Sequence, residues 1–153
     1  MNKKKFTNGF TLIEILIAIA LVALMGGLTI LFLNPPSLLA RGRNAERKSH
    51  LYTIINAIWQ NKSDNNGNFN CVSGDIPTTT AKMAIGVGNY NIAPCLVPIY
   101  LPTMPYDSKA GGAHYASNTD YDTGYNIVGS ATSGRITLNA PWAELGEIIS
   151  VTR

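Results

Sequence analysis

The sequence contains little charge, histidine or cysteine, and these shortages exclude several classes of protein. Only 14% of its 153 residues are charged, and it has two cysteines and two histidines, His50 and His114. It contains no Gly-x-Ser-x-Gly nucleophile motif, no phosphate-binding glycine loop and no paired metal-ligand motif. We therefore expect a protein that is not an enzyme.

The excess of basic residues is small and local. The net charge is +3, and Lys3, Lys4 and Lys5 account for it, because the remaining basic and acidic residues balance. A nucleic-acid surface needs basic residues along a face, so no nucleic-acid partner is expected. The apolar content of 46% argues against a disordered chain. The length favours one globular domain.

A long apolar run follows the basic N-terminus. Residues 10–33 contain one charged residue, Glu14, and form a helix of about 36 Å, which is enough to cross a hydrocarbon core of about 30 Å. A secretory signal has an apolar region of only about 7 to 15 residues. The basic residues before the run place Met1 in the cytoplasm and the chain from Asn34 onward outside. The sequence predicts a single-pass protein of the cytoplasmic membrane.

Glu14 is unusual because a carboxylate inside a membrane-spanning segment is costly. One interpretation places it near the cytoplasmic end of the segment, where it reaches headgroup water. The other interpretation gives it a cationic partner in the membrane. The pattern of charges alone leaves both open.

The residues around Glu14 carry a family resemblance. The segment Gly9-Phe10-Thr11-Leu12-Ile13-Glu14, after a basic leader, resembles the processing site of type IV prepilins. The resemblance implies that a membrane peptidase and methyltransferase cuts after Gly9 and methylates Phe10. It also implies that Glu14 lies beside the N-terminal amine of a neighbouring subunit during filament assembly. The implied partners are other copies or co-assembling pilins, a membrane assembly platform and membrane lipid.

The chain beyond the membrane segment is expected to begin as a helix. Leu51, Ile54, Ile55 and Ile58 recur at helical spacing and give an apolar stripe that can pack on a sheet. The residues Asn34-Pro35-Pro36 predict a kink or break before this helix, because proline lacks a backbone donor. We also expect the apolar helix to be weakened at Gly26-Gly27, and the second helix to end near Asn61.

Short apolar segments near the C-terminus predict a small antiparallel sheet of three or four strands. The expected strands are 125–128, 135–138, 148–151 and a shorter one at 114–116. Together with the long helix they give an α+β, pilin-like fold. The expected organisation is a leader (1–9), a membrane and filament-core helix (10–33) and an exported domain (34–153), which comprises an amphipathic helix (34–61), a connecting loop (62–100) and the sheet (101–153).

Cys71 and Cys95 are expected to form a disulfide, since a pair of cysteines on an exported domain is most simply explained in that way. Closing a loop of about 25 residues stabilises a fold by about 3 kcal/mol. A zinc site needs about four ligands, and neither histidine lies near this pair in the sequence. The best-known major pilins place their disulfide at the C-terminal segment, so this pair departs from that pattern.

Asn118, Asp120 and Asp122 alternate before Gly124 and are weak candidates for calcium ligands. Calcium takes about six to eight oxygens, so three side chains are too few by themselves. The resemblance adds that major pseudopilins hold calcium in this region. An acidic turn is the simpler interpretation, and no cofactor is expected. The aromatic residues of the same region are expected in the sheet core or in subunit contacts: Tyr115, Tyr121, Tyr125 and Trp142.

The resemblance therefore implies a structural subunit of a type IV pilus-like filament. The subunit is a membrane protein before assembly and part of an extracellular or periplasmic filament afterwards. The proline-rich segment from Leu101 to Asp107 favours an alternative, a pseudopilin of a type II secretion system. A third alternative is a signal-anchored surface-binding protein that never polymerises. Cleavage after Gly9 distinguishes the third from the other two.

Overall fold

The computed structural model describes residues 9–153, apart from the side chains of residues 30–33. The chain divides into two compact units, with the boundary after Leu39. We describe each unit by itself and call the second, Ala40–Arg153, the head. Of the predicted leader, only Gly9 lies within the described residues.

The first unit contains the helix α1 (Leu12–Leu33). Its stretch Leu12–Thr29 is long and apolar enough to cross a membrane, and none of that stretch is buried in the structure. The helix continues without interruption through Gly26 and Gly27, so the expected weakening does not break it. The hydroxyl of Thr29 donates to the Gly26 carbonyl over 2.8 Å.

The helix breaks where the prolines predict. Asn34 follows α1 with a left-handed backbone (φ 44°), a conformation that asparagine adopts more readily than most residues. The helix α2 (Pro35–Asp64) then begins at once, since a proline at the first helical position lacks only a donor that has no helical partner. The Ser37 hydroxyl and amide both donate to the Asn34 carbonyl over 3.0 Å.

α2 forms one wall of the head and buries the predicted apolar stripe. Leu51, Ile54, Ile55 and Ile58 are at most 1% exposed. The helix ends at Asp64, one turn later than the expected end at Asn61. The extra turn forms because Asn65 donates its amide to Asn61, and Gly67, with φ 87°, donates to Lys62 and closes the helix.

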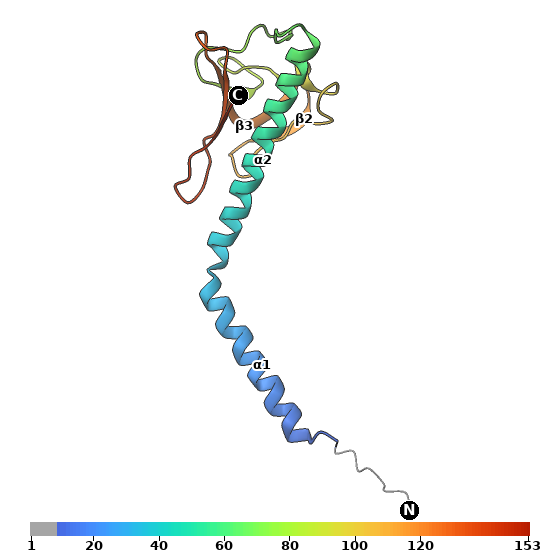
Figure 1. Ribbon diagram of the computed structural model, residues 1–153, viewed down its shortest axis with the longest axis vertical. Coiled ribbons are helices and arrows are strands. Elements are labelled where there is room, and N and C mark those ends of the chain that lie inside the picture. Colours follow the sequence, from blue (N-terminus) through green and yellow to red (C-terminus); the bar gives the residue numbers. More distant parts are fainter. Residues whose placement is uncertain (1–8) are drawn as a thin grey trace, which may run out of the picture. The chain divides into compact units, whose positions relative to one another are not determined.

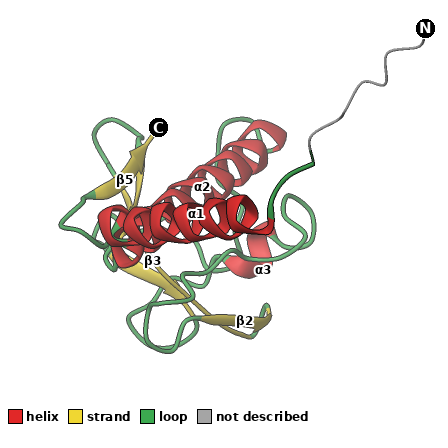
Figure 2. Cartoon of the chain, turned by 90° about the horizontal axis from the view of Figure 1, so that it is seen from below, coloured by secondary structure: helices red, strands yellow, loops and turns green. Residues whose placement is uncertain are grey.

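The sheet of the head is antiparallel and has five strands, in the order β1-β3-β4-β5 with β2 also paired to β3. The strands are β1 (Ala81–Ala84), β2 (His114–Ser117), β3 (Asp120–Gly129), β4 (Ile136–Ala140) and β5 (Ile149–Thr152). In the view of Figure 1, α2 passes in front of β3, and Figure 2 shows the loops of the head in green. The expected α+β class is confirmed.

Two expectations about the head are wrong. The sheet has five strands instead of three or four, and the segment expected as a loop, residues 62–100, contains β1 and the short helix α3 (Ala93–Leu96). β1 shows no alternation because Met83 and Ala84 are both buried, at a shift of its register on β3. A four-residue strand without alternation cannot be recognised from hydropathy.

The core of the head lies between α2, the sheet and the loops around α3. The stripe of α2 shares one buried cluster with side chains of the strands and loops, among them Met83, Ile92, Leu96, Met104, Tyr125, Ile127 and Leu138. Cys71 and Cys95 form a disulfide that fixes the loop after α2 to α3, with 5.0 Å between the two Cα atoms. The head therefore has its own hydrophobic core.

Candidate functional site

The segment Gly9–Glu14 begins α1 with a reciprocal cap. The Glu14 carboxylate accepts from the amide of Thr11 over 2.9 Å and from its hydroxyl over 3.0 Å. The Thr11 hydroxyl in turn accepts from the Glu14 amide over 3.3 Å. This capping box fixes the start of the helix at Leu12. Glu14 thus has a local partner that neither sequence interpretation included.

The residues before the cap are open to solvent. Phe10 is 84% exposed, and a side chain added at Gly9 meets no atom within 4 Å. Thr11 itself has an extended backbone (φ −80°, ψ 152°). The described part of the chain therefore does not enclose the peptide bond between Gly9 and Phe10.

α1 presents apolar side chains on all its sides. The large ones between Leu12 and Leu28 are 52–85% exposed: Leu12, Ile13, Ile15, Leu16, Ile17, Ile19, Leu21, Val22, Leu24, Met25 and Leu28. An isolated helix of this kind is not stable in water and needs lipid or other apolar helices around it. The polar cap at one end and the apolar surface beyond it form the candidate assembly site.

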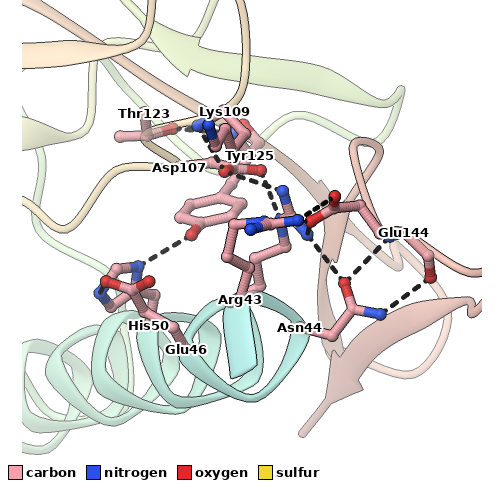
Figure 3. A network of polar contacts seen from close by, with 10 residues as sticks. Arg43, Asn44, Glu46, His50, Asp107, Lys109, Thr123, Tyr125 and Glu144 are labelled. Carbon is pink, nitrogen blue, oxygen red and sulfur yellow. Dashed lines mark hydrogen bonds and ion pairs between the residues drawn. The ribbon is translucent and has the colours of Figure 1, made fainter. Parts of the chain in front are cut away.

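A second polar cluster lies inside the head (Figure 3). Arg47 of α2 is 1% exposed and donates through Nε to Asp107 Oδ2 over 2.7 Å and through Nη2 to Oδ1 over 3.2 Å. Asp107 also accepts from the amide of Lys109 over 3.0 Å. A buried charge is stable only when it is paired and hydrogen-bonded, and this pair meets both conditions.

The same cluster fixes the loop between β4 and β5. Glu144 of that loop accepts from Nε and Nη2 of Arg43 over 2.6 and 2.7 Å, and from Nη1 of Arg47 over 3.0 Å. The Asn44 side chain donates to the Glu144 carbonyl over 2.8 Å and accepts from its amide over 2.9 Å. The hydrogen-bonded guanidinium of Arg43 lowers the pKa of Glu144 to about 2. The cluster ties residues 43–47 of α2 to the loop between β4 and β5.

His50 completes the cluster on the side of β3. Its Nδ1 lies 2.8 Å from the Tyr125 hydroxyl, and burial lowers the pKa of His50 below its ordinary value. We interpret the cluster as a device that joins α2 to the sheet.

The three calcium candidates have other partners in the structure. Asp122 pairs with Lys82, and its other oxygen accepts from the Gly124 amide over 2.8 Å. Asp120 lies 3.0 Å from His114 Nε2, and Asn118 accepts from the Tyr115 hydroxyl over 2.8 Å. Within residues 9–153, no three acidic, histidine or cysteine side chains are grouped to hold a metal. The expectation that the chain uses no cofactor stays a prediction.

The aromatic residues divide between the core and the surface. Tyr121 and Tyr125 are buried, as expected for the sheet core, whereas Trp142 is 56% exposed.

Sequence reasoning missed the buried pair of Arg47 and Asp107 and the role of Glu144. The only signal was the position of Asp107 at the end of a proline-rich segment, which does not indicate a partner 60 positions earlier.

Comparison with known proteins bears on the N-terminal segment. No curated protein and no solved structure matches the chain. Residues 4–30 match the family model described as the prokaryotic N-terminal methylation motif. This match covers Gly9, Phe10 and Glu14 and confirms the resemblance that those residues carry. The chain thus bears the prepilin-type signal of type IV pilins and pseudopilins at its N-terminus.

Proposed function

We propose that this protein is a structural subunit of a type IV pilus-like filament. It is inserted in the cytoplasmic membrane, cleaved after Gly9, methylated at Phe10 and polymerised through α1. The observation that carries the proposal is the methylation motif at the start of a helix whose apolar surface is exposed on all sides. Such a helix is suited first to lipid and then to the core of a filament.

Cleavage adds a charge that assembly can use. Once Gly9 is removed, Phe10 carries a cationic amine beside the carboxylate-bearing first turn of α1. An unpaired charge is costly in lipid. Pairing that amine with Glu14 of a neighbouring subunit neutralises both charges and so lowers this cost. Because a head-to-tail contact between identical subunits does not close, the assembly is open and helical.

The first experiment tests the cleavage. Mass analysis of the mature N-terminus should find a chain that begins at methylated Phe10. Gly9→Val should block cleavage without disturbing the fold, because an added side chain at position 9 meets no atom within 4 Å. Phe6→Ala in the leader is a control that should be cut normally. A mature protein that retains residues 1–9 contradicts the proposal and favours an anchored protein that does not polymerise.

The second experiment tests Glu14 against its local partner. Glu14→Leu should permit membrane insertion and cleavage but reduce the yield of filaments sheared from cells, and Glu14→Gln should behave similarly because it lacks the charge. Thr11→Val is the matched control, since it removes the capping hydroxyl and keeps the carboxylate. It should weaken the helix start by about 1 kcal/mol and leave filament yield near normal. Equal losses in Thr11→Val and Glu14→Leu contradict the pairing role.

The pseudopilin alternative is supported by the segment Leu101–Asp107. Leu101, Met104 and Asp107 are buried, so this proline-rich segment forms part of the head's core. Deleting either the pilus or the secretion assembly platform in cells that express the chain separates the two functions. A pilus subunit needs the pilus platform for filament formation, and a pseudopilin needs the secretion platform.

A further inference from the structure

The two segments that the disulfide joins are also joined by one buried side chain of α2. Asn61 is 3% exposed, and its amide nitrogen donates to the Asn70 carbonyl over 3.0 Å and to the Cys95 carbonyl over 3.1 Å. Its amide oxygen accepts from the Asn70 backbone amide over 2.8 Å. Because Asn70 directly precedes Cys71, a single side chain binds the backbone next to one cysteine and the backbone of the other.

The Asn61 amide does not need the disulfide to make these contacts. An asparagine side chain has two N–H donors, and here one donor binds each of the two segments. The hydrogen bonds run to backbone atoms and involve neither sulfur. A buried polar group left without a partner is costly, so the folded head favours both segments in their places on Asn61 whether the cysteines are oxidised or reduced.

Other contacts hold the same two segments in the head. The Ser73 hydroxyl donates to the Asn91 carbonyl over 2.7 Å, and Leu96, which follows Cys95 in α3, is fully buried in the core. The Cα atoms of Cys71 and Cys95 lie 5.0 Å apart although the two residues are 24 positions apart in the chain. The fold itself therefore supplies contacts that bring the two cysteines together.

We propose that Asn61 is a positioning residue for disulfide formation: its amide aligns Cys71 and Cys95 in the folded head while they are still reduced. The reaction is thiol–disulfide exchange with an external disulfide such as oxidised glutathione. One cysteine thiolate attacks the external disulfide, releases one thiolate and forms a mixed disulfide. The second cysteine thiolate attacks the protein sulfur of that mixed disulfide and releases the other thiolate. The two cysteines lose two protons and two electrons, and the external disulfide is reduced to two thiols.

Alignment acts on the second, intramolecular step of this reaction. On a flexible chain, two thiols 24 positions apart meet rarely, because closing the loop costs entropy. Groups that are already held in place react as if they were present at a much higher concentration. The inference concerns the head alone and depends neither on cleavage after Gly9 nor on filament assembly, so it and the proposed function can fail separately.

Oxidation of the full-length chain in detergent measures the alignment. The chain is reduced, transferred to mixtures of reduced and oxidised glutathione, and trapped by alkylation, so that the fraction of disulfide gives the effective concentration of the two thiols. Asn61→Leu should lower this effective concentration about tenfold, because the hydrogen bonds that hold both segments are lost. Circular dichroism of each reduced chain verifies that the head is folded.

Asn44→Leu is the matched control. Asn44 is 4% exposed, lies about 26 Å along α2 from Asn61, and binds the backbone amide and carbonyl of Glu144 in the same reciprocal way. It should leave the effective concentration unchanged within about twofold. An unchanged value for Asn61→Leu, or an equal drop for Asn44→Leu, overturns the proposal. If the reduced Asn61→Leu chain does not fold, Asn61→Gln takes its place, and the absence of a drop there also overturns the proposal.

A double-mutant cycle separates alignment from stability alone. If the amide and the disulfide reinforce each other, Asn61→Leu should lower the melting temperature more in the disulfide-bonded chain than in a chain that carries Cys71→Ala and Cys95→Ala. Asn44→Leu should lower it equally in the two chains. Equal losses for Asn61→Leu in both chains assign Asn61 to the stability of the core and overturn the proposal.

Discussion

Leu21 of α1 is 53% exposed, whereas Leu51 of α2 is fully buried, although both are leucines on long helices of the same chain. The carboxylates of the two regions differ in the same way. Among residues 9–153, Glu14 is paired with its neighbour Thr11, while Asp107 binds an arginine from a distant segment. The head buries an apolar core and pairs its buried charges, whereas the described side chains of α1 form no such core. α1 is therefore the part of the molecule that requires lipid or another subunit.

The largest expected effect comes from removing one member of the buried ion pair in the head. Asp107→Ala removes the buried carboxylate that accepts from Nε and Nη2 of Arg47 and leaves these two donors unpaired, which should lower the free energy of unfolding by about 3 to 5 kcal/mol. Urea unfolding of the detergent-solubilised chain, followed by circular dichroism, measures it. Lys82→Ala is the control, because its pair with Asp122 is partly exposed and should cost less than about 1 kcal/mol. Equal effects of the two substitutions contradict the importance of burial.

The second prediction concerns the disulfide. Replacing Cys71 and Cys95 together by alanine should lower the free energy of unfolding by about 3 kcal/mol, because the unfolded chain gains loop entropy. The far-ultraviolet spectrum should still report folded helix and sheet at low temperature, since the core cluster of α2 and the strands does not depend on the bond. A drop in melting temperature measures the effect. An unchanged melting temperature argues against a stabilising role.

The third prediction uses pH to test the contact between α2 and the β4–β5 loop. The pKa of Glu144 is about 2 in the folded head against an ordinary value of 4.5, so its charge stabilises the fold above about pH 4.5. That contribution is lost as the pH falls from 4.5 toward 2. The difference in urea midpoint between the native chain and Glu144→Gln should therefore shrink over this range. A difference that does not change with pH shows that the ion pair contributes nothing.

The smallest expected effect compares one substitution in the two regions. Gly42→Ala on the exposed face of α2 meets no atom within 4 Å and should stabilise the head by about 0.5 to 1 kcal/mol through helix propensity. Gly26→Ala in α1 also meets no atom within 4 Å and should leave unfolding of the head unchanged. Urea midpoints of the two variants measure this contrast. A shift for Gly26→Ala shows that α1 and the head unfold together.

Local patterns in the sequence predicted the parts of the fold that depend on neighbouring residues. The apolar run of α1, the stripe that includes Leu51 and Ile54, and the break at Asn34 all follow from spacing or from proline. Four of the five strands, β2, β3, β4 and β5, were also predicted, because short apolar segments stand there between turn residues. The recognition of the N-terminal motif rests on a short contiguous segment.

The buried cluster could not be predicted in the same way. Arg47 lies in a stretch of α2 rich in charge, which resembles a solvent-exposed face, and its burial depends on Asp107 and on the β4–β5 loop. In the sequence, Glu144 is an acidic residue in a loop with no indicated partner. Its contact with Arg43 exists only once the sheet has formed. Such contacts depend on the completed tertiary structure and leave no periodic signal.

The separation of these partners also sets the timing of folding. Arg47 leaves the ribosome about 5 to 20 seconds before Glu144 at ordinary synthesis rates, and Asp107 emerges between them. The head can reach its final state only when almost the whole chain has been made, so α1 is complete before the domain behind it can fold.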